Sequence, residues 1–355
     1  MTIAIDCRMF NASGIGVYLR GCLPCFLKTA NNFLLIGDPG QLCVFSSCKN
    51  AEIINCNIKI FSLKELFFFP CGILKKINKA DVFYSPFFNI PRGINIPVFT
   101  SIHDIIFPDM PELSSKTGLA ARMWFFRRAY KKSKKIFTVS CFSKSRIEHH
   151  LGSLKPVIVT YSAIHPMFLE YKAASGHIQK KETIVFIGNI KKHKGLYCLL
   201  DAFHLAKKEG LPHKLVIIGS KDNFRSSDDI ILKKIESIGD NSVTFSDFVS
   251  DELLMEHLSS AALLVQPSLY EGFCLPPLEA MVLGTQALIS DIPVLKEVYK
   301  EYPVNFFRAG DSIDLKDKIL ELLYNKPVKT ISLANNLINI YNFNNTASII
   351  LNNLS

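Results

Sequence analysis

Residues 262–283 read ALLVQPSLYEGFCLPPLEAMVL, and this stretch decides the fold class. A continuous apolar run leads into a turn around Gly272, and Pro277 suits the first turn of a helix, where its missing amide hydrogen costs nothing. Continuous apolar strands that are each followed by a helix are typical of a parallel sheet covered on both faces. The stretch therefore predicts one βα unit of a doubly wound α/β fold.

The same unit recurs along both halves of the chain. In the second half the expected strands are TIVFIGN (183–189), KLVIIGS (214–220), SVTFSDF (242–248), ALLVQPS (262–268) and QALISD (286–291), with helices near 195–209, 228–238, 251–260 and 277–283. In the first half they are TIAID (2–6), NFLLIG (32–37), DVFYS (81–85), PVFTSIHD (97–104), KIFTVS (135–140) and PVIVTYS (156–162). Two such series predict two Rossmann-like domains that face one another, with the ligand crevice at the carboxyl ends of their strands.

The polar segment EYKAASGHIQKKE over 170–182 lacks periodicity and predicts a linker. The first domain is then expected over 1–169 and the second over 183–335. The segment 336–355 is compatible with a helix, and the pattern alone leaves open whether it packs on the second domain or returns to the first.

Length, composition and charge exclude several classes of protein. With 355 residues, of which 48% are hydrophobic and 20% charged, the chain is too large for a stapled mini-protein and too apolar for a disordered one. The formal net charge of +10 favours anionic partners such as phosphates or phospholipid surfaces. The ten cysteines lack paired metal spacing, which favours reduced buried thiols and predicts no metal site. Neither a signal peptide nor a membrane span is evident, so we expect a cytoplasmic protein.

Two carboxylates flank the turn of the deciding stretch. Glu271 is expected in the loop and Glu279 in the helix, both at the carboxyl edge of the sheet. Backbone amides around Phe273, Cys274 and Leu275 are available to a phosphate, whereas carboxylates beside them suit hydrogen bonds from sugar hydroxyls. The combination indicates a ligand that carries both phosphate and sugar.

Three further positions each have a functional and a purely structural interpretation. Three lysines crowd the turn GNIKKHKG over 188–195, where they either compensate a bound anion or form a solvated charge run. His103 ends the strand expected over 97–104, where it either contacts a sugar hydroxyl or phosphate or is a satisfied strand-end histidine. Gly16 lies in SGIGVY (13–18), which is either a ligand-contacting loop or a plain tight turn.

The stretch RMWFFRRAYKKSKK over 122–135 interleaves aromatic and basic residues. As a helix it is suited to an anionic membrane surface, contacted through Arg127, Arg128, Lys131 and Lys132. The alternatives are an ordinary helix with one solvated face, or nucleic-acid binding. Since no nucleic-acid-binding motif accompanies the charge, the last is the weakest.

Taken together, these stretches resemble the retaining glycosyltransferases of family 4, which have the GT-B fold, and among them the bacterial mannosyltransferase-like members that build O-antigen and other surface polysaccharides. The matching stretches are SGIGVYL (13–19), HDIIFPDMPE (103–112), FTVSCFSKSRI (137–147), IGNIKKHKGLYCLLDAF (187–203), SDELLMEHLSSAALLVQPSLYEGFCLPPLEAMVLG (250–284) and SDIPVLKEV (290–298). They span most of the chain in the right order, and the two glutamates with the PPLEAM continuation are highly specific.

The resemblance implies transfer of a hexose from a nucleotide diphosphate sugar to an acceptor hydroxyl, with retention of anomeric configuration. Lys194 matches the family lysine that neutralises the donor diphosphate. Glu271 matches the acid that contacts the donor sugar, and Glu279 the acid that binds the ribose. Asn189 stands where many relatives carry arginine, so one phosphate cation is missing there.

The remaining correspondences concern the loops around the donor. Gly272 and the amides of Phe273, Cys274 and Leu275 match the phosphate-cradling turn, and Gly16 matches the glycine loop across the cleft. His103 matches the histidine near the reaction centre, so that His103, Lys194 and Glu271 form the implied catalytic set.

The resemblance also implies the partners. GDP-mannose is the favoured donor substrate, followed by UDP-sugars and GDP-fucose, and the acceptor is a lipid-linked oligosaccharide at the inner face of the cytoplasmic membrane. No cofactor and no metal are expected, because Lys194 and helix amides take the place of a metal. The alternatives are a non-catalytic nucleotide-binding or membrane-docking protein of the same fold, and an NAD-dependent oxidoreductase, which Leu19 disfavours because it interrupts the GxGxxG pattern.

Overall fold

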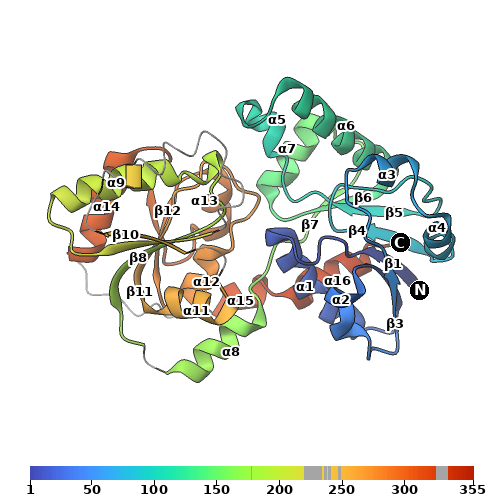
Figure 1. The fold of residues 1–355 in the computed structure, drawn as a ribbon, viewed down its shortest axis with the longest axis horizontal. Helices are drawn as coiled ribbons and strands as arrows, with labels where there is room; N and C mark the ends of the chain where they lie inside the picture. The colour runs from blue at the N-terminus through green and yellow to red at the C-terminus, as the bar shows by residue number, and fades with distance from the viewer. Residues whose placement is uncertain (177, 220–233, 236–237, 239–240, 247–248, 325–334) are drawn as a thin grey trace. The chain divides into compact units, whose positions relative to one another are not determined.

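The computed structural model describes the whole chain except residues 177, 220–233, 236–237, 239–240, 247–248 and 325–334. It divides into two compact units (Figure 1). The first unit comprises Met1–His165 together with Ile340–Ser355, and the second comprises Pro166–Asn339.

The first unit is built on a parallel sheet of seven strands. In spatial order they are β3 (Ala51–Asn55), β2 (Asn32–Gly37), β1 (Thr2–Asp6), β4 (Val82–Ser85), β5 (Val98–Ser101), β6 (Ser133–Thr138) and β7 (Val157–Val159). Chain order reverses between β1 and β4, which makes this pair the topological switch point where doubly wound sheets bind ligands. Ile3, Ala4 and Ile5 of β1 are all buried, so both faces of the sheet are covered.

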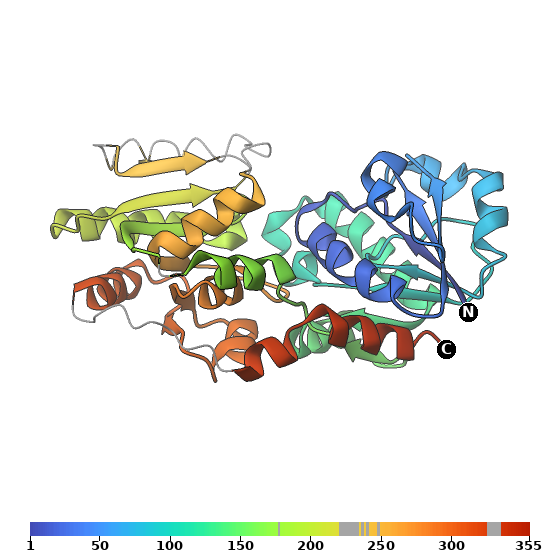
Figure 2. The same cartoon turned by 90° about the horizontal axis from the view of Figure 1, so that it is seen from below.

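Helices and short turns connect these strands. They are α1 (Ser13–Leu27), α2 (Pro39–Leu42), η1 (Cys43–Phe45), α3 (Leu63–Phe67), α4 (Cys71–Ile77), α5 (Ile106–Asp109), η2 (Pro111–Leu113), α6 (Lys116–Lys132), α7 (Cys141–Leu151) and the late helix α16 (Phe343–Asn352). The last helix, red in Figure 2, packs against α1. The contact is close, since a Cβ added to Gly21 would lie 2.2 Å from the Phe343 ring.

The second unit repeats the same architecture. Its sheet, in the described residues, has six parallel strands in the order β10 (Val243–Ser246), β9 (Lys214–Ile218), β8 (Lys181–Ile187), β11 (Ala261–Gln266), β12 (Gln286–Ser290) and β13 (Asn305–Phe307). The connecting elements are α8 (Pro166–Ser175), η3 (Lys192–Lys194), α9 (Leu196–Lys208), α11 (Asp251–Ser260), α12 (Pro276–Val282), α13 (Pro293–Tyr299), α14 (Ser312–Tyr324) and α15 (Asn335–Ile340). Chain order reverses between β8 and β11, which are the switch point of this sheet.

The boundary between the units differs from the predicted linker. It falls between His165 and Pro166, and residues 170–175 form the second half of α8. Phe168 of α8 is buried, which anchors the helix although its sequence has almost no amphipathic pattern. Residue 177 of the predicted linker and most of the helix expected near 228–238 lie outside the described residues.

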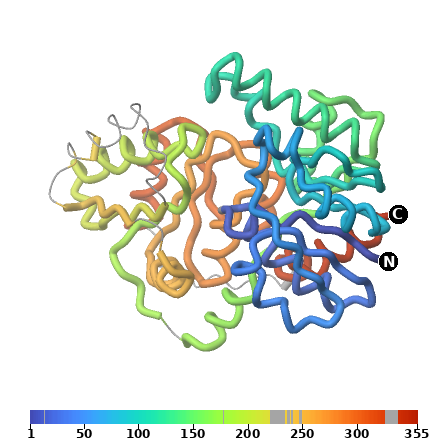
Figure 3. Tube along the Cα trace, turned by 45° about the vertical axis from the view of Figure 1, so that its right-hand side comes forward, coloured from blue at the N-terminus to red at the C-terminus, as the bar shows by residue number. Residues whose placement is uncertain are grey.

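The chain passes back into the first unit after the second is complete. Ile340–Ser355 belong to the first unit, and both chain ends lie there (Figure 3). The backbone amide of Ile164 donates to the carbonyl of Tyr341 at 3.0 Å, so the outgoing and returning segments run side by side. Of the two placements left open for the tail, the structure has the return to the first unit.

Candidate functional site

Lys194 and Glu271 meet at the switch point of the second sheet. Lys194 ends η3, in the loop that follows β8, and Glu271 lies in the loop that follows β11. The Lys194 ammonium group donates to both carboxylate oxygens of Glu271, at 2.7 and 2.9 Å. Two residues 77 positions apart thus form one ion pair where a doubly wound sheet binds its ligand.

The two loops are joined by their backbones. Gly195 has φ +69°, and a Cβ there would lie 1.9 Å from the carbonyl oxygen of Pro267. This close approach requires glycine, since other residues rarely adopt that φ and have no room. Next to it the amide of Leu269 donates to the carbonyl of His193 at 2.7 Å. The spacing between Lys194 and Glu271 is therefore set by rigid backbone contacts.

Two serines extend the site below Glu271, and sequence reasoning missed both. Ser268 donates its hydroxyl to Glu271 at 2.7 Å, and the hydroxyl of Ser290 donates to the carbonyl of Ser268. Both follow or end central strands, and that position was the only available signal. They leave Glu271 with one orientation.

The ion pair is shielded from solvent but charged. Burial raises the pKa of Glu271, but the Lys194 charge and the hydrogen bonds from Lys194 and Ser268 outweigh it and hold that pKa below its usual value. His193 beside it is neutral at physiological pH, because burial and the nearby Lys194 lower its pKa to about 4. Lys194 is thus the positive charge within this pair that a ligand phosphate can use.

The turn between Glu271 and α12 has an unusual backbone. Cys274 is buried with φ +76°, a conformation that favours glycine, and the Tyr299 hydroxyl holds its carbonyl oxygen. The backbone amides of Cys274 and Leu275 have no acceptor among the described residues. They lie at the positive end of α12 and are available to an anion. Gly272 and Phe273 lie in the same buried turn.

Glu279 and Asn189 complete the predicted donor set in this unit. Glu279 is half-buried in α12, and within the described part of the chain its carboxyl group has no hydrogen-bond or ion-pair partner. Burial, with a smaller contribution from Asp251, raises its pKa to about 8. Asn189 is half-buried and lies two residues after the end of β8. No other cation of the described residues ion-pairs with Glu271 in place of the arginine missing at 189.

His103 belongs to the first unit, just beyond the carboxyl end of β5. Its Nε2 lies 2.9 Å from the carbonyl oxygen of Pro86, which can only accept, so Nε2 carries the proton. Burial lowers the pKa of His103 to about 4, and the Tyr18 ring packs edge-on at 4.8 Å. The imidazole is therefore neutral, and its Nδ1 presents a lone pair to a hydroxyl donor.

Gly16 does not lie in a loop. The helix α1 begins at Ser13, so Gly16 occupies its first turns, which corrects the expectation of a loop over 13–18. A Cβ at Gly16 would lie 2.5 Å from the carbonyl oxygen of Phe10, which also accepts from Arg20 at 2.8 Å. Close backbone packing within the first unit thus accounts for glycine at this position.

The basic helix predicted over 122–135 exists as α6 up to Lys132, and residues 133–135 belong to β6 instead. The four cations named on it differ in exposure. Arg127, Lys131 and Lys132 are exposed. Arg128 is half-buried and donates to the carbonyl oxygen of Ile90, so it serves the interior of the first unit. Within the described residues, no helix is both long and apolar enough to cross a bilayer.

The known sequences that this chain resembles include a glycosyltransferase family and individual glycosyltransferases. The family described as glycosyl transferases group 1 matches residues 167–340. O-antigen chain mannosyltransferase B of Escherichia coli is 27% identical over 62% of this chain, and O-antigen chain mannosyltransferase RfbU of Salmonella typhimurium is 29% identical over 49%. The chain spans 59% and 47% of the lengths of these relatives.

Solved structures match over the whole chain. HepE of Anabaena, solved in complex with UDP-glucose, has a TM-score of 0.73 at 17% identity, and the alignment covers 100% of this chain and 99% of HepE. Sucrose-phosphate synthase of Thermosynechococcus elongatus has a TM-score of 0.75 at 17% identity, with 99% of this chain and 98% of that chain covered. These likenesses and the two parallel sheets show the GT-B fold.

Proposed function

From the match of residues 167–340 to the glycosyl transferases group 1 family, we propose that the chain transfers a hexose from a nucleotide diphosphate sugar to a hydroxyl group of an acceptor. The observation that carries the proposal is the Lys194–Glu271 pair at the switch point of the second sheet. A fixed ammonium group beside a carboxylate suits a ligand whose phosphate is anionic and whose sugar donates hydrogen bonds.

In this proposal Lys194 and the free amides of Cys274 and Leu275 hold the diphosphate. Negative charge develops on the leaving phosphate as the glycosidic bond breaks, and preorganised positive groups stabilise that charge without reorganising. Glu271 accepts hydrogen bonds from hydroxyls of the transferred sugar. Because Lys194 supplies the fixed charge, we expect transfer without a resident metal ion.

In this proposal His103 accepts a hydrogen bond from a substrate hydroxyl group. Its Nε2 proton is committed to Pro86, so Nδ1 orients a hydroxyl of the sugar or of the acceptor. Neither role needs a carboxylate nucleophile. We therefore propose retention by same-face substitution, in which the departing phosphate oxygen takes the proton of the incoming hydroxyl.

The relatives suggest the substrates to try first. Those named as mannosyltransferases favour GDP-mannose as donor, and HepE, solved with UDP-glucose, makes a UDP-sugar the second choice. Two of these relatives are named for the O-antigen chain, and we propose a lipid-linked oligosaccharide of surface polysaccharide synthesis as the acceptor.

A donor screen tests the function. The purified chain is incubated with GDP-mannose, UDP-glucose, UDP-galactose and GDP-fucose, and release of nucleoside diphosphate is measured with and without EDTA. We expect release from one donor, unchanged by EDTA. Silence with all of them, together with tight nucleotide binding, would instead favour a non-catalytic nucleotide-binding protein of the same fold.

Nucleotide binding is expected to release a proton from Glu279. In the free protein its pKa is raised to about 8, so the carboxyl is mostly protonated at pH 7. Two ribose hydroxyls donating to it favour the ionised form and lower that pKa. Binding of GDP or UDP at pH 7 should then release up to about one proton, and none well above pH 9.

Isothermal titration calorimetry in buffers of different ionisation enthalpy measures this release. Glu279→Gln should abolish it and weaken nucleotide binding. Glu252→Gln, a change at an exposed position of α11, serves as the control. Equal proton release by wild type and Glu279→Gln would remove Glu279 from the ribose site.

The first unit supplies a membrane-facing surface in this proposal. Trp124 is 51% exposed and lies on α6 one turn before the exposed Arg127 and two turns before Lys131. These residues share a stripe of the helix, and an aromatic ring flanked by cations is typical of a helix at an anionic bilayer interface. We therefore propose peripheral attachment at the inner face of the cytoplasmic membrane.

Neutralising Arg127, Lys131 and Lys132 to glutamine should lower binding to vesicles of phosphatidylglycerol and phosphatidylethanolamine by roughly 100-fold, at about 1 kcal/mol per cation. Co-sedimentation measures it. The triple change of Lys49, Lys208 and Lys214, exposed elsewhere, removes the same charge and should have little effect. Equal losses in both triples would indicate net charge rather than this surface.

A further inference from the structure

A cavity of about 450 Å³ lies at the carboxyl edge of the first sheet, lined by the loops that follow β1, β2 and β3. This volume falls within the range of about 300–1,000 Å³ that is typical of small-ligand pockets. Lys194, Glu271 and Glu279 lie in the second unit, whereas all residues lining this cavity belong to the first.

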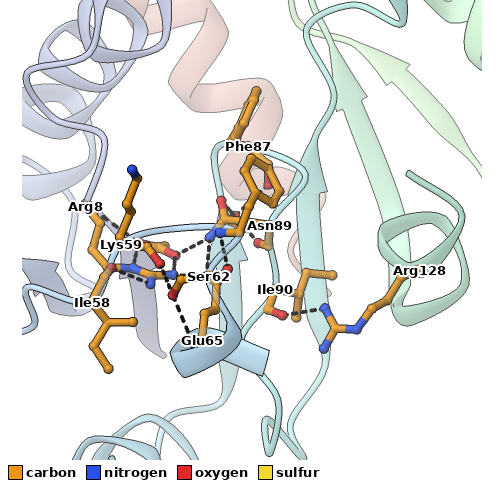
Figure 4. Close-up of polar contacts among 12 residues, drawn as sticks. Arg8, Ile58, Lys59, Ser62, Glu65, Phe87, Asn89, Ile90 and Arg128 are labelled. Carbon is orange, nitrogen blue, oxygen red and sulfur yellow. Dashed lines mark hydrogen bonds and ion pairs between the residues drawn. The ribbon is translucent and has the colours of Figure 1, made fainter. Parts of the chain in front are cut away.

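A buried polar network fixes one wall of the cavity. The Arg8 side chain is 3% exposed, and its guanidinium group donates to Asp6 at 2.9 and 2.6 Å, to Glu65 at 2.5 Å and to the Ile58 carbonyl at 3.0 Å (Figure 4). The Asn89 amide group donates to both carboxylates, at 2.9 and 3.0 Å. The loop after β3 is thereby held rigidly over the sheet edge.

The charged groups in and beside the cavity carry a net charge of −1. The single positive charge of Arg8 faces the two negative charges of Asp6 and Glu65, so it offers nothing to an anion. Of the other lining groups, Asp38 and Lys59 carry opposite charges. A phosphate bound here would meet Asp38 as well as Lys59, so the cavity favours a neutral ligand.

The remaining lining groups suit hydroxyls. The side-chain amides of Gln41 and Asn57 have no partner in the described residues, and each can both donate and accept. One oxygen of Asp38 accepts from the Gly40 amide at 2.8 Å, which leaves the other for a ligand. Met9 and Ile58 add apolar surface, which the carbon faces of a sugar ring can cover.

One loop links this cavity to His103. In the loop that follows β4, Asn89 binds the carboxylates of the network and Pro86 accepts from His103. The cavity wall and the orientation of the imidazole are thus set by the same five-residue segment, 86–90. Segment 86–90 therefore positions both a ligand in the cavity and a hydroxyl group bound to Nδ1 of His103.

We propose that this cavity binds the saccharide part of the acceptor, as one or two neutral hexose rings. The inference rests on the proposed function, because it assigns the first unit the sugar that receives the hexose. It names Gln41 and Asn57 as the main hydrogen-bonding residues and excludes the lipid diphosphate from this cavity.

The test is the binding of α-mannobiose to the full chain, followed by ligand-observed NMR. We expect saturable binding, no competition by pyrophosphate, and at least a tenfold weakening in the double variant Gln41→Leu/Asn57→Leu, which loses two or more hydrogen bonds of about 1 kcal/mol each. Gln179→Leu, the same type of change at an exposed site of the second unit, should leave binding unchanged.

GDP and UDP binding by calorimetry separates the two hypotheses. Three results would show that the cavity assignment is wrong while nucleotide binding persists. The double variant binds mannobiose as tightly as wild type does, pyrophosphate displaces mannobiose, or wild type does not bind mannobiose. If wild type binds no nucleotide at all, the proposed function fails first. Retained nucleotide affinity shows that the second unit of the double variant is folded, and an unchanged thermal unfolding profile shows the same for the first unit, which carries both substitutions.

Discussion

Lys194→Ala should lower kcat/KM for the donor by roughly 10²–10³-fold, the loss typical of removing one preorganised charge-stabilising group. The ammonium group is the cation that contacts Glu271 at the switch point. Its loss also leaves the buried Glu271 carboxylate without its counter-charge, so the melting temperature of the second unit should fall. Initial rates and thermal unfolding measure the two effects.

A double variant separates chemistry from stability. Lys194→Ala combined with Glu271→Gln leaves no unpaired buried charge, so the melting temperature should recover while the rate does not. Lys191→Ala removes an exposed lysine from the same turn and should change the rate little. A recovered rate in the double variant, or an equal loss with Lys191→Ala, would contradict the role given to Lys194.

Gly195→Ala should destabilise the second unit by roughly 3–5 kcal/mol, the sum of left-handed backbone strain and overpacking. The new methyl group would lie 1.9 Å from the Pro267 carbonyl oxygen, which is backbone and cannot swing aside. The loops after β8 and β11 would have to separate, and the His193–Leu269 hydrogen bond joins those same loops. Calorimetric unfolding should show a melting temperature lower by roughly 10 °C.

Gly210→Ala is the matched control. Gly210 also has a positive φ, of +90°, but a Cβ there would meet nothing within 4 Å. It should cost only the backbone strain, about 1–2 kcal/mol. If both variants unfold at the same temperature, the close approach at Pro267 is not what requires glycine at 195.

The central strands were predictable, but two of the four edge strands were not. Strands β1, β2, β8 and β11 are continuous apolar runs because both of their faces are buried, and the predicted ranges lie within two residues of the observed ones. Two edge strands, β3 and β13, were missed. The sequence AEIIN of β3 is mixed in polarity and β13 has only three residues, because an edge strand has one neighbour and less to bury.

The functional residues likewise include some that the sequence could predict and some that it could not. Lys194 and Glu271 could be placed because each lies in the connection that follows a central strand and matches a family motif. The Arg8 network could not, because Asp6 ends strand β1, Glu65 lies in helix α3 and Asn89 lies in the loop after β4, and no spacing encodes their meeting. The one available signal was a charged pair, Asp6 and Arg8, at the end of a buried strand.

The return of the chain to the first unit dictates an order of assembly on the ribosome. α1 is among the first elements synthesised, yet its partner α16 emerges only after the whole second unit. When the second unit folds, it brings together the two chain segments that connect it to the first unit, and the Ile164–Tyr341 hydrogen bond requires these segments to lie side by side. Before it folds, the same segments are the ends of a long flexible loop, whose closure costs more entropy. The nascent first unit therefore waits for its neighbour, and a defect confined to residues 166–339 should slow the maturation of both.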